Sequence, residues 1–307
     1  MTTMYQSTST WFVSPAKLNL FLHVCGRFED GYHDLQTYFQ LLDVGDEIQV
    51  QPNLSGKILM KTDMPDVEPS QNLMVIAATE LKKAAMTVLP SSVGQRLQLQ
   101  HLGADIFIRK NMPMGGGIGG GSSNAATVLL VLNKFWNLQL PHEILMSIGK
   151  QIGADVPVFI KGMSGFAEGI GERLTPSISF LQSLPKGHCF LIANPGIHVS
   201  TPSIFQHPDL PRTTPKMRFD DVKFENTRND CQTLVEKAHP KVANLLQWLL
   251  NYAPSRMTGT GASVFAVFAS ENEAKQALSD LPRKYQGFIA NGTARSLLHH
   301  QLEQLDH

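Results

Sequence analysis

The chain of 307 residues is 42% hydrophobic and 17% charged, which is typical of a globular protein long enough to form two packed lobes. Its 26 Lys and Arg residues balance its 26 Asp and Glu residues, so no overall positive field attracts a nucleic acid or an anionic membrane. We therefore expect no nucleic-acid partner and no membrane attachment, and an anionic ligand has to be bound by local features.

Cysteine usage and the first residues of the chain indicate a cytoplasmic protein. Cys25, Cys189 and Cys231 are scattered and lack metal-type spacing, which argues against a disulfide framework or a zinc site. Residues 1–10 lack the basic and apolar segments of a signal peptide, and no apolar run reaches membrane-spanning length.

The first third of the chain mixes strand-like and helix-like segments. Apolar residues at helical spacing predict a helix over residues 72–86. Alternating or strand-type residues predict strands over residues 11–13, 18–24, 47–51 and 97–109.

Further along, residues 125–132 are apolar enough for a buried helix, and residues 141–152 carry one apolar face that stops at Gly153. Pro157 favours an extended conformation at the residue before it, so we expect Asp155 at a corner between a helix and a strand. The proline-rich residues 207–215 are predicted to form a linker or a substrate loop.

The most informative segment is residues 113–124, where six glycines lie within twelve residues. A strand-like run over residues 104–109 precedes it and an apolar helix follows. Glycine lets backbone N–H groups approach an anion closely, and a helix beginning at Ser122 and Ser123 would add the positive end of its dipole. The arrangement of strand, glycine loop and helix predicts a phosphate-binding cradle.

Other glycine motifs fit this segment less well. Gly115, Gly117 and Gly120 match the G-x-G-x-x-G pattern, but no second strand ending in an acidic residue follows about 20 residues later. No Lys follows the last glycine as a P-loop requires, and the chain lacks the H-R-D and D-F-G triplets of protein kinases. A flexible linker is disfavoured because linkers are not normally placed between a periodic strand and an apolar helix.

Three motifs in order along the chain resemble the GHMP kinases, the small-molecule kinases grouped as galactokinase, homoserine kinase, mevalonate kinase and phosphomevalonate kinase. The motifs are residues 14–20, residues 113–126 and the second glycine-rich turn at residues 258–263. The resemblance implies a two-lobed α+β fold with the active site in the cleft between the lobes. It implies an N-terminal domain over residues 1–163 with the ATP phosphate loop, and a C-terminal domain over residues 164–307 that contributes to the substrate pocket.

Within the family, four segments are similar to the branch whose acceptor is cytidine diphosphate-methylerythritol: residues 17–20, 30–37, 153–159 and 253–261. This similarity implies ATP-dependent phosphorylation of the tertiary hydroxyl of the methylerythritol unit, on the non-mevalonate route to isoprenoid precursors. The expected partner is that small-molecule substrate, and the expected assembly is a monomer or a weak homodimer.

Phosphoryl transfer requires a cradle for the donor phosphates, positive charge for the transition state and a group that receives the alcohol proton. We expect Lys17 to supply the charge and Asp155, which matches the catalytic Asp of the family, to receive the proton. A structural alternative for Asp155 is a helix-end carboxylate that binds nearby backbone N–H groups. The ATP cradle is expected from Pro113, Met114, Gly115, Gly116, Gly117, Ile118, Gly119, Gly120, Gly121, Ser122 and Ser123.

ATP and Mg²⁺ are the implied cofactors. Ser122 and Ser123 have hydroxyl groups that could bond phosphate, ligate Mg²⁺ or cap the helix, and these roles are compatible. The identity of the metal ligands stays open.

The resemblance also implies the acceptor site: Asn19, Tyr32 and His33 contact the cytidine-bearing substrate, and Thr201 and Phe205 form the opposite wall. Tyr32 and Phe205 would sandwich the cytosine ring while His33 bonds its edge. The structural alternative is that Phe205 is a core aromatic residue and that His33 binds a turn carbonyl. The position of Tyr32 and His33 in a predicted turn favours recognition.

Two rival functions remain. A homoserine or mevalonate type of kinase on the same fold would lack the cytidine contacts. A nucleotide-binding regulator would keep the cradle without catalysis, and the presence of both Lys17 and Asp155 argues against it.

Overall fold

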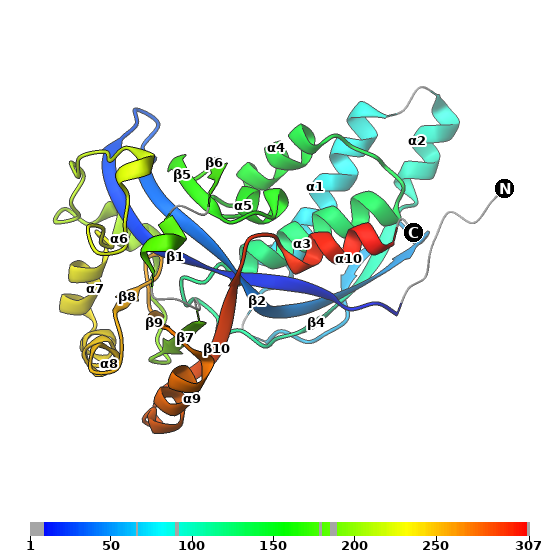
Figure 1. The fold of residues 1–307 in the computed structure, drawn as a ribbon. Helices are drawn as coiled ribbons and strands as arrows, with labels where there is room; N and C mark the ends of the chain where they lie inside the picture. Colours follow the sequence, from blue (N-terminus) through cyan, green and yellow to red (C-terminus); the bar gives the residue numbers. More distant parts are fainter. Residues whose placement is uncertain (1–8, 66, 90–91, 178–179, 185–188, 306–307) are drawn as a thin grey trace.

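The computed structural model describes residues 9–65, 67–89, 92–177, 180–184 and 189–305. Two long antiparallel strands, β1 (Phe12–Arg27) and β2 (His33–Asn53), form its central hairpin. The hairpin runs across the molecule from one lobe to the other (Figure 1). It contains the strands predicted over residues 18–24 and 47–51, so residues that are far apart along each strand serve both lobes.

The described strands form a 10-stranded sheet in the order β3-β4-β2-β10-β7-β9-β8, while β1 pairs with β2 and β5 pairs with β2 and β6. The pairing of β3 with β4 is parallel, and the other pairings are antiparallel. The remaining strands are β3 (Ile58–Met60), β4 (Gly103–Arg109), β5 (Gly165–Gly169), β6 (Arg173–Pro176), β7 (Cys189–Asn194), β8 (Ser255–Met257), β9 (Val264–Phe268) and β10 (Gln286–Thr293).

Helices of the first lobe share one hydrophobic core with β1, β2 and β4, and α3 lies directly on β1 and β2. They are α1 (Leu73–Val88), α2 (Val93–Gln100), α3 (Gly120–Phe135), α4 (His142–Ile152) and α5 (Val156–Lys161). Helix α3 is apolar on most sides because it lies between the sheet, α1 and α5, and Ala125, Val128 and Leu132 are fully buried there. This packing fixes the direction in which the N-terminus of α3 points.

The second lobe places helices against β7, β8 and β9. They are α6 (Thr201–Gln206), α7 (Gln232–Ala238), α8 (Pro240–Leu250) and α9 (Glu271–Asp280), with short 3₁₀ segments at Phe180–Ser183 and Phe219–Asp221; another 3₁₀ segment, Pro69–Gln71, precedes α1. Antiparallel strands with segregated helices make an α+β fold, as predicted. Among the residues that the structure describes, no helix has both the length and the apolar character needed to cross a membrane.

The chain returns to the first lobe at its end. Helix α10 (Leu297–Gln304) packs against β1, and Leu298 is buried in the core of the first lobe (Figure 1). The Gln301 side chain accepts a hydrogen bond of 2.8 Å from the backbone N–H of Val13. Strand β5 also joins this lobe by pairing with β2. Segments from the second half of the sequence therefore complete the first lobe.

Local expectations were confirmed for two helices. Helix α1 begins after Asn72, whose Oδ1 accepts a hydrogen bond of 3.0 Å from the N–H of Met74, and α4 ends at Gly153. The strand expected over residues 97–109 was wrong in its first part, because α2 covers residues 97–100. Ser92 caps the N-terminus of α2. Leu97 is 52% exposed and Leu99 is buried, but both lie on this helix, so their alternating burial does not indicate a strand.

Two more differences lie beside the glycine loop. The strand expected after Asp155 is instead helix α5, and Pro157 lies in its first turn. A proline is accepted there because the N–H groups of the first turn have no partner within the helix. Helix α3 begins at Gly120 after an N-cap at Gly119, two residues before the expected start. The corner at Asp155 is therefore between two helices.

Candidate active site

The glycine-rich loop joins β4 to α3, and two of its positions require glycine. Gly117 has φ of +73°, and a Cβ there would lie 2.5 Å from the carbonyl oxygen of Thr258. Gly119 has φ of +77°, and its Cβ would lie 2.8 Å from the ring of Phe159. A side chain at either position would be strained and would clash, so glycine allows the loop to pack tightly against its neighbours.

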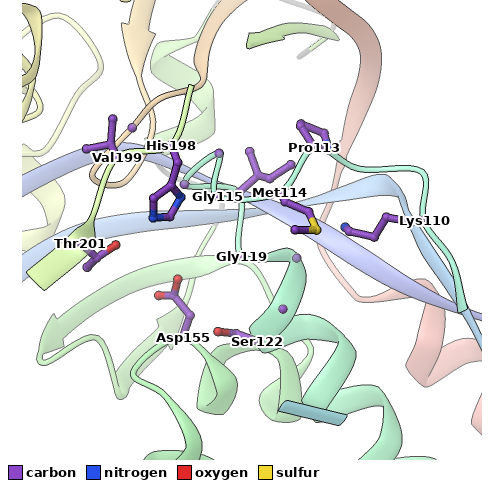
Figure 2. A pocket seen from close by; sticks show the side chains of 16 residues that line it. Lys110, Pro113, Met114, Gly115, Gly119, Ser122, Asp155, His198, Val199 and Thr201 are labelled. Atoms are coloured by element: carbon purple, nitrogen blue, oxygen red, sulfur yellow. The ribbon is translucent and has the colours of Figure 1, made fainter. Parts of the chain in front are cut away.

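The loop and the N-terminus of α3 line a cavity of about 240 Å³, which we call the phosphate cavity (Figure 2). The first turn of α3 supplies unpaired backbone N–H groups and the positive end of the helix dipole, which together attract an anion. The expected cradle residues from Pro113 to Ser122 all line it. They are joined by Lys110, Asp155, His198, Val199, Thr201 and Gly261.

The two serines of the loop have different surroundings. Ser122 lines the phosphate cavity, whereas Ser123 is fully buried and its Oγ lies 2.9 Å from the Oγ of Ser14. Because the N-cap of α3 is Gly119, neither serine occupies the capping position. The structure thus brings Ser122 to the cavity and uses Ser123 to hold α3 against β1.

Lys17 is placed by an irregularity in β1, where the register with β2 shifts between Pro15 and Lys17. The residue is 2% exposed. Its Nζ donates to Asn19 Oδ1 at 2.5 Å and to the Gly117 carbonyl at 3.2 Å, and it lies 3.2 Å from Asp155 Oδ2. The three ammonium protons therefore each have an acceptor, which fixes a positive charge between the loop and Asp155.

Asp155 is the residue before α5, but its side chain makes no capping hydrogen bond to that helix. The helix-end role considered from the sequence therefore does not describe it. Its carboxylate pairs with Lys17 and keeps 35% side-chain exposure. In Figure 2 the carboxylate points from the α4–α5 corner into the phosphate cavity.

A second cavity, of about 260 Å³, adjoins the first one, and we call it the acceptor cavity. Asp155, Gly117, Ser122 and Thr201 line both cavities. Asp155 thus stands where the contents of the two cavities would meet. The other lining residues are Lys17, Asn19, Leu22, Leu35, Thr37, Phe39, Ala154, Ile170, Phe205, Gly259 and Thr260.

The expected acceptor residues are brought together only in part. Asn19, Thr201 and Phe205 line the acceptor cavity, and Asn19 Nδ2 donates to Thr37 Oγ1 at 2.9 Å. Tyr32 is 54% exposed, and neither it nor His33 is among the lining residues. The His33 ring stacks on Phe205 with 5.0 Å between centroids, so it packs against this wall. Burial and the neighbouring Arg212 lower the pKa of His33 below its usual value.

The turn at residues 258–263 connects the lobes at this site. Thr258 Oγ1 accepts a hydrogen bond of 2.8 Å from the backbone N–H of Asn19, and Ser263 N–H donates to the Gly116 carbonyl at 3.2 Å. Asn229 Nδ2 donates to the carbonyls of Met257 and Gly259, each at 2.8 Å. The third motif therefore holds β1 and the glycine loop together rather than forming a separate site.

Known proteins resemble this chain over nearly its whole length. A relative from Shewanella woodyi named 4-diphosphocytidyl-2-C-methyl-D-erythritol kinase is 46% identical over 303 residues, which cover 98% of this chain and 100% of the relative. A relative of the same name from Hahella chejuensis is 44% identical over 95% of this chain and 96% of its own length. Residues 74–163 match the model of the GHMP kinases N terminal domain, and residues 217–287 match that of the GHMP kinases C terminal. The chain belongs to the GHMP kinases.

Solved structures place this GHMP kinase in the same fold group. The crystal structure of a 4-(cytidine 5'-diphospho)-2C-methyl-D-erythritol kinase has a TM-score of 0.73 and 27% identity, covering 92% of this chain and 100% of the other. A mevalonate kinase structure has a TM-score of 0.61 at 16% identity, covering 92% and 99% of the two chains, which shows a shared fold.

Sequence reasoning missed two polar residues that shape the phosphate cavity of this GHMP kinase. Asp46 is fully buried in β2, and its carboxylate accepts hydrogen bonds from Lys110 Nζ at 2.6 Å and from Asn124 Nδ2 at 2.9 Å. It also accepts from the backbone N–H groups of Asn111 and Met112, each at 2.9 Å. Asp46 therefore fixes both ends of the loop. The position of Lys110 just before the glycines was a usable signal, whereas nothing local marked Asp46 as buried.

His198 was also missed. Its ring covers Gly115, where a Cβ would lie 2.2 Å from Nδ1, and it projects into the phosphate cavity opposite Asp155 (Figure 2). It comes from the segment between β7 and α6, far from the loop in the sequence. No motif in the sequence pointed to it.

Proposed function

We propose that the protein transfers the γ-phosphoryl group of ATP to the 2-hydroxyl of 4-diphosphocytidyl-2-C-methyl-D-erythritol, a step of the non-mevalonate route to isopentenyl diphosphate. The observation that carries the proposal is the place of Asp155, which lines both cavities beside the fixed ammonium group of Lys17. The names of relatives that align over nearly the whole chain support the choice of acceptor.

In this reaction the acceptor oxygen attacks the γ-phosphorus, the bond between that phosphorus and the bridging oxygen breaks, and ADP leaves. The hydroxyl proton moves to the Asp155 carboxylate, which acts as the general base. Lys17 keeps Asp155 oriented and offers positive charge to the developing negative charge in the transition state. The Lys17 bond to Gly117 couples this charge to the donor loop.

The phosphate cavity suits the triphosphate of ATP, because backbone N–H groups, the α3 terminus and Lys110 all favour negative charge there. The described residues contain no group of three or more His, Cys, Asp or Glu side chains arranged to hold a metal ion. The Ser122 hydroxyl, which lines the phosphate cavity, would be one ligand of a Mg²⁺ ion that takes its other ligands from phosphates and water. When bound, Mg²⁺ neutralises phosphate charge.

The acceptor would occupy the second cavity with its base beside Phe205. Asn19 and Thr201 supply polar groups in the cavity, and Phe205 supplies an aromatic face. Tyr32, which is exposed at the turn before β2, would cover the other face of the cytosine, and His33 would bind its edge. Because the described residues of one chain line both cavities, we expect a monomer or a weak homodimer to be active.

An ADP-release assay with three acceptors tests the proposal. We expect turnover with 4-diphosphocytidyl-2-C-methyl-D-erythritol and none above background with homoserine or mevalonate. Turnover that prefers homoserine or mevalonate would assign the protein to another kinase of the same fold. ATP binding without turnover of any acceptor would support a nucleotide-binding regulator.

A further inference from the structure

Arg212 lies in the proline-rich segment 207–215 and holds the C-terminal end of α6. Its Nη2 donates to the carbonyls of Phe205 at 2.9 Å and His207 at 2.8 Å. Its Nη1 donates to the carbonyls of Leu210 at 3.0 Å and Pro208 at 3.4 Å. The Phe205 carbonyl lies in the last turn of α6 and the other three follow the helix, where carbonyls have no helical partner, so the guanidinium caps the helix that carries Phe205.

The remaining donor of Arg212 reaches a different element. Nε donates to Nε2 of His33, at the start of β2, over 3.2 Å. The five N–H donors of the guanidinium are thereby all engaged. Because a guanidinium can only donate, His33 Nε2 must present its lone pair, and the ring proton of a neutral His33 is then on Nδ1.

His33 and Phe205 are stacked on each other, and Arg212 binds both of them. Phe205 in turn lines the acceptor cavity, whereas Arg212 does not. The orientation of an aromatic wall and the tautomer of its supporting histidine thus depend on one side chain outside the cavity. A hydrogen-bond network around a recognition residue fixes its geometry in this way.

We propose that Arg212 is a positioning residue for acceptor recognition: it holds Phe205 in stacking geometry and fixes His33 as the tautomer with its proton on Nδ1. The proposal rests on the proposed function, because it assigns the base-recognition wall of that acceptor site. A ring N–H at Nδ1 offers a donor to a base edge that carries acceptors, so the tautomer decides which edge is matched.

Residues 214–217, at the end of this segment and directly after it, have further attachments that keep the segment in place when Arg212 is replaced. Thr214 Oγ1 donates to Asp230 Oδ2 at 2.7 Å, and Lys216 Nζ lies 2.6 Å from Asp34 Oδ2. The backbone N–H of Met217 donates to Gln36 Oε1 at 2.9 Å. The last two of these contacts are made to β2 beyond His33. A change at Arg212 should therefore disturb α6 and His33 more than the fold.

The test compares Arg212→Gln and Arg212→Lys with Arg218→Gln, an exposed arginine of the same stretch that serves as the matched control. Calorimetry measures the affinities for 4-diphosphocytidyl-2-C-methyl-D-erythritol and for ATP. We expect both Arg212 variants to bind the acceptor about tenfold or more weakly, the scale of losing a charged hydrogen bond, with ATP affinity and kcat within about twofold. The control should bind both ligands as the parent does.

A second readout separates positioning from a general structural role. Long-range ¹⁵N–¹H spectra of the His33 ring, assigned with His33→Gln, should show the proton on Nδ1 in the parent and a shift toward Nε2 in Arg212→Gln. In a His33→Ala background, Arg212→Gln should lose its effect on discrimination between the cytidine acceptor and a uridine analogue. An unchanged tautomer, an unchanged acceptor affinity, or equal losses for acceptor and ATP would each overturn the proposal.

The activity of the parent protein and the role of Arg212 are tested by different outcomes. If the parent protein does not phosphorylate the cytidine acceptor, the proposed function fails, whatever the His33 spectra show. If the parent does so and the Arg212 variants match it in affinity and tautomer, only the role of Arg212 fails.

Discussion

The carboxylate of Asp155 lies 3.2 Å from Lys17 Nζ, and its proposed task is to take a proton from the acceptor hydroxyl. Asp155→Asn keeps the shape of the side chain but removes the base. We expect kcat to fall by about 10²–10⁴, the range for losing a positioned general base, with ATP affinity nearly unchanged. Steady-state kinetics and calorimetry check both parts. The exposed Asp280→Asn on α9 is the control, and turnover of Asp155→Asn within a few fold of the parent would demote Asp155 to a structural role.

Phe205 and Tyr32 are the two aromatic residues proposed to enclose the cytosine. Phe205→Ala and Tyr32→Ala should each lower acceptor affinity by about 1–3 kcal/mol, the usual effect of losing one stacked base contact. ATP affinity should stay the same, because neither residue lines the phosphate cavity. Calorimetry with both ligands measures this, and Tyr252→Ala, which removes an exposed aromatic residue that lines neither cavity, is the control. Undiminished acceptor binding in both variants would place the cytidine pocket elsewhere.

Individual residues were predictable from the sequence where a motif surrounds them. Lys17 and Asp155 stand in recognisable segments, and the structure places them 3.2 Å apart. Asp46 and Arg212 could not be found in this way, because their roles consist of contacts with segments far away in the sequence. Helices α1 and α2 and strands β3 and β4 lie between Asp46 and Lys110 in the sequence, yet Lys110 Nζ lies 2.6 Å from Asp46 Oδ2.

At the scale of elements, the glycine loop makes a sharp prediction at Gly117. A Cβ there meets the Thr258 carbonyl at 2.5 Å and the backbone has φ of +73°, so Gly117→Ala must distort the loop. We expect ATP to bind about tenfold or more weakly, corresponding to the roughly 1–2 kcal/mol cost of a left-handed L-residue. Gly94→Ala on helix α2, where the new Cβ would lie 4.0 Å from Ser92 Oγ without a clash, should leave ATP affinity unchanged. Calorimetry that finds normal ATP affinity in folded Gly117→Ala would count against the cradle.

Elements with strong local signals were predicted well, and those decided by context were not. The Asn72 cap and the apolar spacing after it defined α1, and Gly153 defined the end of α4. Helix α2 was missed because its one buried residue, Leu99, alternates with the exposed Leu97 as a strand would. The strand expected at Pro157 was wrong because proline breaks a helix at interior positions but is accepted in the first turn, where Pro157 lies in α5.

At the scale of the whole molecule, the family resemblance predicted two lobes and a cleft, whereas the sequence pattern did not show how the lobes interlock. The hairpin β1–β2 spans both lobes, β5 pairs with β2, and α10 packs into the hydrophobic core of the first lobe. Such pairings join residues far apart in the chain, and no local periodicity encodes them. The return of α10 also supports the helix that follows Asp155, since His299 Nε2 lies 3.0 Å from the Ile160 carbonyl oxygen in α5.

Three histidines at these junctions make the stability of the whole molecule depend on pH. Burial lowers the pKa of His23, His33 and His299 below the ordinary value of 6.5. Arg212 adds to the effect at His33, and the positive charge of Arg295 opposes protonation of His299. The folded protein therefore holds these rings neutral at a pH where the unfolded chain already binds protons.

Proton linkage gives the direction in which stability changes with pH. The contribution of the three neutral histidines to the free energy of unfolding is fully present above pH 6.5 and is lost as the pH falls through their lowered folded-state pKa values. We expect Tm to be flat above about pH 7 and to fall increasingly between about pH 6.5 and 5.5, before most carboxylates titrate. His299→Gln keeps a donor for Ile160 without a titrating ring, so it should flatten this decline. His300→Gln, its exposed neighbour on α10, should not. Scanning calorimetry of the parent and the two variants across this pH range checks the prediction. A Tm that is constant down to pH 5.5, or a steeper decline in His299→Gln, would show that these histidines do not cause the loss of stability at acid pH.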